Sequence, residues 1–108
     1  MYEPLKHVKT FFVAGFQHYD GALAFDQLKV GTVLDLVPER DNPHDPDAIE
    51  VRYEDIKLGY VPHADNALLS VMAFYGHADV FEARILQVAP EADPWQQVRV
   101  GIYVTDKR

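Results

Sequence analysis

Residues 48–61, AIEVRYEDIKLGYV, contain the pattern that decides the fold. In the first half, apolar residues alternate with charged ones, which is the two-residue period of a strand with one buried face. A polar turn at Glu54 and Asp55 separates this strand from a second apolar stretch that ends at Val61. Two such stretches joined by a two-residue turn predict a β-hairpin.

Other parts of the chain also have strand character, because they are rich in β-branched and aromatic residues. They lie at residues 9–16, 32–37, 80–88 and 96–104. Irregular, Pro-rich loops at residues 39–47 and 89–94 separate ordered elements. Together with the hairpin, these segments predict an all-β protein with one or two helices and about six short strands.

One helix is predicted between Pro62 and Gly76. Pro62 suits a first helical turn, Asp65 places negative charge near the start, and Gly76 provides a stop. Helical spacing predicts one buried stripe, formed by Ala64, Ala67, Leu68, Val71, Met72 and Tyr75.

Length and composition fit one globular domain that spans residues 1–108. Hydrophobic residues make up 48% of the chain and charged residues 25%, close to the average for globular proteins. The chain contains no cysteine, and no stretch stays apolar for the ~18 residues of a membrane span. The N-terminal residues lack the apolar run of a signal peptide. We therefore expect a cytoplasmic protein without contact to a membrane.

The net charge of −7 limits how this chain could bind nucleic acid. Proteins that coat a nucleic-acid backbone depend on clustered Lys and Arg that neutralise phosphates. Any contact with nucleic acid is therefore expected to be local, short and weak.

Three blocks of sequence stand at fixed distances from one another. The first is VAGF at residues 13–16, followed by Tyr19, and the third is LGYVP at residues 58–62. The second and most specific is PERDNPHDPDAIEV at residues 38–51. Together they resemble the HIRAN domain family. The resemblance covers nearly the whole chain and implies a small six-stranded β-barrel related to OB and SH3-like barrels. It also implies a non-catalytic module that binds the 3′-hydroxyl end of single-stranded DNA, in the setting of DNA repair or processing.

The same resemblance implies which residues contact the DNA. They come from three segments and are Gln17, His18, Tyr19, Asn42, His44, Asp45, Tyr60 and His63. Asp45 corresponds to the family's acceptor of the terminal hydroxyl, and His44 to the aromatic residue before it. No cofactor is implied. A helicase or nuclease partner is compatible with the resemblance, and the oligomeric state is left open.

The chemistry of residues 41–47 agrees with recognition of a DNA end. A carboxylate accepts a hydroxyl proton, an imidazole can stack on a base, and two prolines stiffen the loop. A phosphate on the end would place like charge against Asp45, which favours a free hydroxyl. The same residues also suit a loop in which Asn and Asp simply cap turns, and spacing alone does not separate the two hypotheses.

Metal binding and catalysis are alternative roles for the same residues. A calcium loop is rejected, because Pro43 and Pro46 replace a ligand and the glycine turn, and Arg52 stands where a bidentate Glu is needed. A zinc site at His18, His44, His63 and Asp45 stays open, although no pair has the short spacing typical of zinc ligands. A hydrolase that uses His44 or His63 with Asp45 lacks a recognisable nucleophile, so we predict no enzyme. A protein-interaction module with little DNA affinity is the main alternative.

Overall fold

Six antiparallel strands form the framework of the computed structural model, which describes residues 5–105. They are β1 (Leu5–Phe12), β2 (Val33–Pro38), β3 (Ile49–Tyr53), β4 (Ile56–Tyr60), β5 (Phe81–Val88) and β6 (Val98–Thr105). The strand order is β1-β6-β5-β2-β3-β4. The predicted hairpin is confirmed as β3 and β4, and the expected six-stranded, barrel-like all-β fold is confirmed with it.

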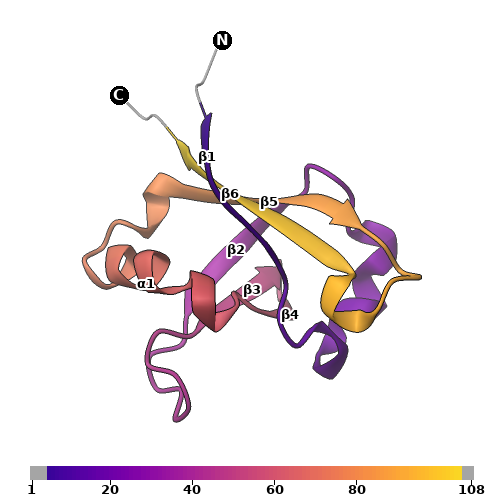
Figure 1. The fold of residues 1–108 in the computed structure, drawn as a ribbon, viewed down its shortest axis with the longest axis horizontal. Coiled ribbons are helices and arrows are strands. Elements are labelled where there is room, and N and C mark those ends of the chain that lie inside the picture. Colours follow the sequence, from indigo (N-terminus) through magenta and orange to yellow (C-terminus); the bar gives the residue numbers. More distant parts are fainter. Residues whose placement is uncertain (1–4, 106–108) are drawn as a thin grey trace.

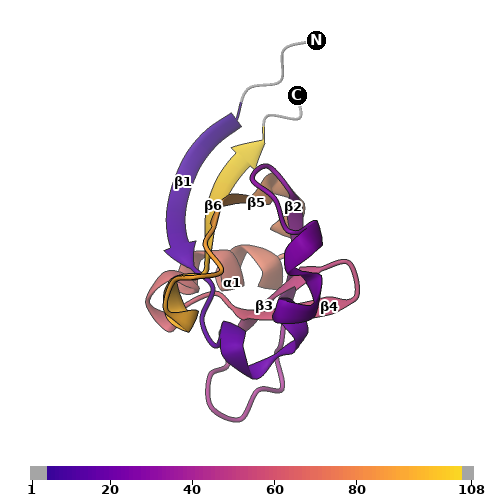
Figure 2. The same cartoon turned by 90° about the vertical axis from the view of Figure 1, so that its right-hand side faces the viewer.

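The sheet curls until its two edge strands approach each other (Figures 1 and 2). Just beyond the end of β1, Ala14 N–H donates to the Tyr60 carbonyl at 2.8 Å, and Tyr60 N–H donates to the Ala14 carbonyl at 2.9 Å. This single bridge joins the first and last strands of the sheet order. It closes one end of the barrel, whereas the sheet is not closed along its whole length.

The inner face of the curled sheet holds the core. The alternation seen in the sequence is responsible: Val98, Val100 and Ile102 of β6 are all buried, as are Ile49 and Val51 of β3. Phe16 and Leu28, from the segment after β1, close the core at one end and are also buried.

Short helices connect the strands. The 3₁₀ helices are η1 (Phe16–His18), η2 (Asp20–Gln27), η3 (His63–Asp65), η4 (Ala78–Val80) and η5 (Pro94–Gln96), and the α-helix is α1 (Ala67–Phe74). The helical segment η2 was not predicted. It packs against β4 and buries Ala24 between apolar neighbours, so a segment without a clear helical period takes its structure from tertiary packing.

The predicted first strand is shifted in the structure. It was expected at residues 9–16, but β1 is Leu5–Phe12 and Phe16 already belongs to η1. Gly15 explains the early end, because its φ of 73° lies in the left-handed region and turns the chain out of the strand.

The predicted helix was wrong in extent and in orientation. Pro62 lies outside it, and a break at Asn66 separates η3 from α1. Of the predicted stripe, Leu68, Val71 and Tyr75 are exposed, whereas Leu69 is buried.

Two polar contacts account for this orientation. Asn66 donates to Asp45 and Ser70 donates to Asp47, both across to the loop before β3. Residues four apart lie on one helix face. Because nearly every other side chain of α1 is apolar, these contacts, and not the apolar period, decide which face turns inward.

Gly59 makes the barrel-closing bridge possible, which gives a first prediction. Its φ is 155°, and a Cβ there would collide with the Ala14 carbonyl oxygen. Gly59→Ala should therefore lower the free energy of unfolding by about 3 kcal/mol or more, from backbone strain and overpacking together. Gly31→Ala is the matched control: its φ is 93°, but a Cβ there would meet no atom within 4 Å. Backbone strain alone should lower the free energy of unfolding of the Gly31→Ala variant by about 1 to 2 kcal/mol. Urea denaturation measures both, and equal losses would contradict the importance of the bridge.

Candidate functional site

A cavity of about 330 Å³ lies beside the barrel-closing bridge, between the β2–β3 loop and the end of β4. Ala14, Ala48 and Val61 form its apolar part. Six of the eight predicted contact residues line the rest: Tyr19, Asn42, His44, Asp45, Tyr60 and His63. Segments that are far apart in the sequence thus meet at one surface.

Asn42 shapes the loop that carries the cavity's polar groups. Its Oδ1 accepts from the backbone N–H groups of His44 at 2.8 Å and Asp45 at 3.0 Å, and its Nδ2 donates to Glu39 Oε1 at 2.9 Å. This is an Asx-type turn, in which the side chain replaces backbone partners. Asn42 thereby fixes the two residues that follow Pro43 and has a positioning role.

The Asp45 carboxylate is held by three donors. Oδ1 accepts from the Asp47 N–H at 2.9 Å. Oδ2 accepts from Asn66 Nδ2 and faces His63 Nδ1, each at 2.9 Å. An ionised carboxylate has about four acceptor positions, so one position remains for a ligand hydroxyl. The carboxylate is therefore fixed in place and still able to accept a hydrogen bond.

Asn66 is a site residue that the sequence did not reveal. It is only 1% exposed, and its amide is satisfied through Asp45. The sequence places it inside a predicted helix, where an Asn gives no signal of a contact with a loop about twenty residues earlier.

The pair formed by Asp45 and His63 shifts both acid–base equilibria. The hydrogen bond from His63, followed by that from the Asp47 amide, lowers the pKa of Asp45 below its ordinary 3.8. The hydrogen bond to Asp45 raises the pKa of His63 above its ordinary 6.5. His63 is largely exposed, with 83% of its side chain accessible. A ligand can therefore displace its ring from Asp45 with little rearrangement.

A second group of contacts lies at the edge of the cavity. The rings of Tyr19 and Tyr60 meet edge to face with centroids 5.9 Å apart, and Lys57 Nζ lies 4.4 Å from each centroid. Lys57 also donates to the Tyr60 hydroxyl at 2.8 Å and lies 3.3 Å from Glu50. Desolvation acts to lower the pKa of Lys57, but its hydrogen bonds to Tyr60 and Glu50 outweigh this and raise it. The ammonium group is thus a permanent cation beside two aromatic rings.

Lys57 was also missed from the sequence, for a geometric reason. In a regular strand, residues 57 and 60 point to opposite faces. The β3–β4 ladder is irregular between Val51 and Arg52: Glu50 pairs with Tyr60, whereas Arg52 pairs with Lys57. The extra residue in β4 brings Lys57 and Tyr60 to the same face.

Gln17 and His18 lie outside the cavity. Both are exposed on η1, directly before Tyr19. They flank the site without lining it, and their predicted role in DNA contact stays a prediction.

The proposed zinc ligands can be located in the same way. His44, His63 and Asp45 line the cavity, but within residues 5–105 no three His, Cys, Asp or Glu side chains are grouped closely enough to hold a metal ion. Among the described residues there is also no helix long and apolar enough to cross a membrane.

Comparison with known proteins agrees with the fold. The model of the HIRAN domain family matches residues 8–105, nearly the whole chain. The chain belongs to the HIRAN domain family. HIRAN domains are a family of generally non-catalytic DNA-binding modules. No curated protein sequence matches the chain.

Two solved structures share the HIRAN fold of this chain. A protein from Lactobacillus plantarum superposes with a TM-score of 0.77 at 21% identity, over 97% of this chain and 99% of the other. The HIRAN domain of human HLTF superposes with a TM-score of 0.73 at 15% identity, over 98% of this chain and 81% of the other. At these identities the likeness concerns the fold.

Titration of this HIRAN domain tests the Asp45–His63 pair. The lowered pKa of Asp45 means that the pair stabilises the fold above about pH 4 and that this is lost as the pH falls through the folded-state value. The raised pKa of His63 means that the stabilisation is complete below pH 6.5 and is lost as the pH rises through its folded-state value. The pair therefore contributes most between about pH 4 and 6.5.

NMR titration of the His63 ring checks this directly. Asp45→Asn should return the pKa of His63 towards 6.5. Asp41→Asn, an exposed carboxylate of the same loop, should leave it raised. If both variants gave the same His63 titration, the 2.9 Å contact would not exist in solution.

Proposed function

We propose that this HIRAN domain binds the 3′-hydroxyl end of single-stranded DNA in the 330 Å³ cavity and does no chemistry on it. The observation that carries the proposal is the Asp45 carboxylate, which lines the cavity, is fixed by three donors and keeps one acceptor position. A terminal hydroxyl can donate a hydrogen bond to this carboxylate, whereas the sugar–phosphate backbone of the strand interior has no such donor.

The same carboxylate provides selectivity. A 3′-phosphate would bring at least one negative charge against the ionised Asp45, and the lowered pKa of Asp45 prevents relief by protonation near neutral pH. His63 lines the same cavity, and in this proposal its protonated ring contacts the phosphate on the 5′ side of the terminal nucleotide. The site would thus bind the 3′-hydroxyl end of a strand in preference to its interior.

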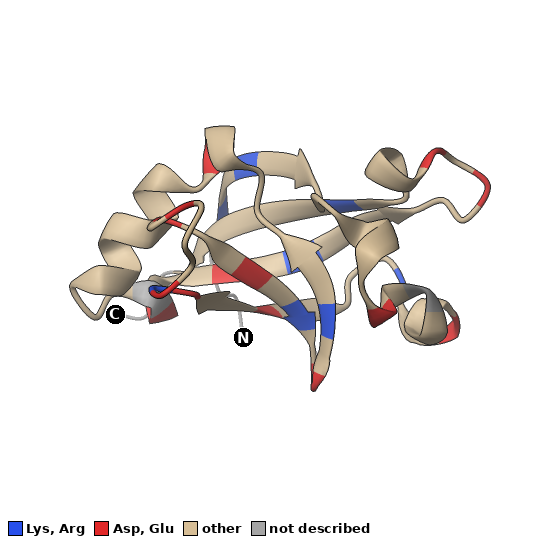
Figure 3. Ribbon diagram, turned by 90° about the horizontal axis from the view of Figure 1, so that it is seen from below, with Lys and Arg blue, Asp and Glu red and all other residues tan. Residues whose placement is uncertain are grey.

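The remaining lining residues suit the terminal nucleotides. His44 and the rings of Tyr19 and Tyr60 offer faces or edges for bases, and Lys57 adds a fixed cation beside the two tyrosines. Over the described part of the chain, Lys and Arg are scattered among Asp and Glu, and Arg52 and Lys57 form an adjacent pair across β3 and β4 (Figure 3). Binding that depends on the end, with few phosphate contacts, is consistent with this distribution.

Catalysis has no support in the surroundings of Asp45 and His63. The sequence contains one serine and no cysteine. That serine, Ser70, donates to Asp47 at 3.0 Å, so its hydroxyl is engaged with a different carboxylate. We therefore propose a binding role in DNA repair or processing in the cytoplasm, in which a nuclease or helicase partner would supply the chemistry.

Fluorescence anisotropy with short single strands tests the end preference. We expect tighter binding to a 3′-hydroxyl strand than to the same strand with a 3′-phosphate. Asp45→Asn should weaken binding of the hydroxyl strand roughly tenfold or more, because a charged hydrogen-bond acceptor contributes about 1.5 to 3 kcal/mol. Asp41→Asn should behave like the wild type. Equal affinity for both ends, or equal loss in both variants, would overturn the proposal.

Binding should also respond to pH and only weakly to salt. Affinity should rise from pH 7.5 to pH 6, because His63 lines the cavity and its contact with Asp45 raises its pKa above 6.5, so that its positive charge builds up over this range. His63→Gln should reduce this rise, whereas His77→Gln, an exposed histidine elsewhere, should not.

The slope of log K against log salt should be about −1, as for one or two phosphates. A slope steeper than about −3 would indicate a basic groove that the structure does not explain.

A further inference from the structure

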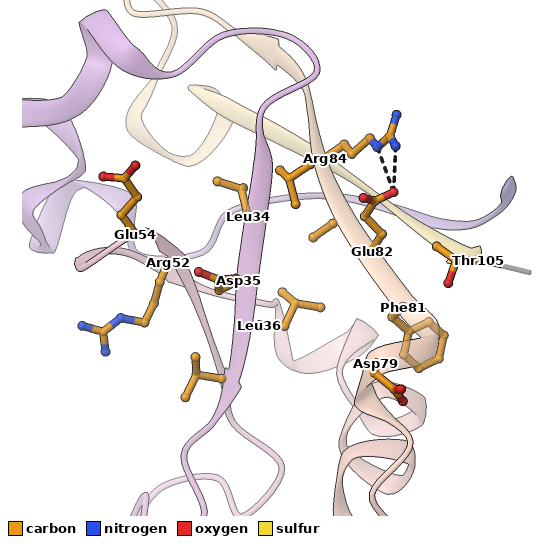
Figure 4. Close-up of a pocket in the computed structure, with 13 residues that line it drawn as sticks. Leu34, Asp35, Leu36, Arg52, Glu54, Asp79, Phe81, Glu82, Arg84 and Thr105 are labelled. Carbon is orange, nitrogen blue, oxygen red and sulfur yellow. Dashed lines mark hydrogen bonds and ion pairs between the residues drawn. The ribbon is translucent and has the colours of Figure 1, made fainter. Parts of the chain in front are cut away.

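β2 and β5 part from each other shortly after they pair. Their ladder contains Val33 with Arg84 and Leu34 with Ala83, and it ends there. Beyond this point β2 continues beside β3, and the first residues of β5 continue beside β6. Figure 4 shows the two strands diverging below Leu34, with Leu36 and Phe81 on opposite sides of the opening.

The alternation of hydrogen bonds shows which backbone groups face this opening. Ile85 N–H donates to the Thr32 carbonyl at 2.9 Å, and hydrogen-bonded pairs of an antiparallel ladder recur at every second residue. Leu34 and Ala83 form the next such pair, and Leu36 and Phe81 would form the one after it. On the other edge of β2, Glu39 N–H donates to the Ala48 carbonyl, so the odd-numbered residues of β2 form their backbone hydrogen bonds with β3. The backbone groups of Leu36, an even-numbered residue, therefore point away from β3. The backbone N–H and C=O groups of Leu36 and Phe81 thus face the opening and have no strand opposite them.

The opening is a groove of about 850 Å³. Its inner wall is apolar, because Leu36 and Phe81 are half-buried and pack over Leu69 and Ala73 of α1. On the outer face, Val33 and Val37 of β2 are 53% and 37% exposed. The groove is therefore apolar on the inside and has two free strand edges.

The outer rim is acidic. Four carboxylates line the groove, on Asp35, Glu54, Asp79 and Glu82, against two guanidinium groups, on Arg52 and Arg84. Arg84 is paired with Glu82 at 2.8 Å, and Arg52 lies 3.6 Å from Glu50. Within residues 5–105, Asp35, Glu54 and Asp79 form no ion pair. Three carboxylates at the rim are thus available to an external cation.

We propose that this groove binds an extended, basic segment of a partner protein, which adds to the sheet as a strand between β2 and β5. A segment in register with β2 would place the residue opposite Leu36 on the inner face, against apolar side chains, and its neighbours on the outer face, beside Asp35 and Glu82. The preferred sequence therefore alternates apolar residues with Lys or Arg. Main-chain hydrogen bonds to Leu36 and Phe81 supply the part of the affinity that does not depend on the partner's side chains.

This surface differs from the DNA site. It shares no lining residue with the 330 Å³ cavity, and its acidic rim disfavours phosphates. The inference does not depend on DNA binding, and a domain that holds a strand end could use this groove to recruit a basic partner.

A fluorescein-labelled peptide, Lys-Val-Lys-Val-Lys, is the probe. It should bind the full chain at low salt, whereas Glu-Val-Glu-Val-Glu should not. The same basic peptide with N-methyl groups on alternate amides should bind at least tenfold more weakly, because its ladder bonds are blocked. In hydrogen-exchange NMR, the peptide should protect the amides of Leu36 and Phe81. Equal binding of the methylated peptide, or no change at these amides, would overturn the proposal.

Charge reversal provides a second test. Asp35→Lys with Asp79→Lys should weaken peptide binding roughly tenfold at low salt, since two exposed ion pairs become repulsive. Glu91→Lys with Asp93→Lys changes the net charge equally, at exposed positions of the β5–β6 loop. This control should retain the affinity, and equal loss in both double variants would show attraction to overall charge alone. The comparison of peptides on the wild type decides the question if the first variant does not fold.

Discussion

The two hydrogen bonds between Ala14 and Tyr60 are the contact on which the site depends. They join the end of the first strand to the end of β4, and Gly59 permits this approach because a side chain there would collide with Ala14. Tyr19 follows five residues after Ala14, and Tyr60 is part of the bridge itself. This closure of the barrel therefore brings Tyr19 against β4 and forms one wall of the cavity.

The second element of the site is a loop that is rigid through its own side chains. Asn42 binds two backbone amides, and Asp45 and Asp47 receive donors from α1. The helix is thus oriented by the loop, and the loop by the helix. This mutual arrangement places a carboxylate at the cavity without leaving it buried and unpaired, which would be costly. In the proposed function, the acidic chain would recognise a nucleic acid through one hydroxyl more than through a field of positive charge.

Periodic features were predictable from the sequence. The β3–β4 hairpin was expected because apolar and charged residues alternate over residues 49–53, as in a strand with one buried face. The resemblance of the NPHD loop and two other blocks to the HIRAN family implied eight contact residues, and six of them line the cavity. The orientation of α1 was not predictable, since its side chains are apolar nearly all round and two polar contacts decide it. Lys57 was hidden by a strand irregularity, and Asn66 by a long-range contact. Interactions between distant segments therefore carried the information that local patterns lacked.

Chemical-shift mapping by ¹H–¹⁵N NMR tests the central claim most directly, because it locates the bound end of the strand without assuming any residue. A short single strand with a free 3′-hydroxyl should perturb the amides of Tyr19, His44, Asp45 and His63 most strongly. The amides of Leu36 and Phe81, in the groove between β2 and β5, should change little. Perturbations centred on that groove, or absent at Asp45 when the strand is in excess, would contradict the account.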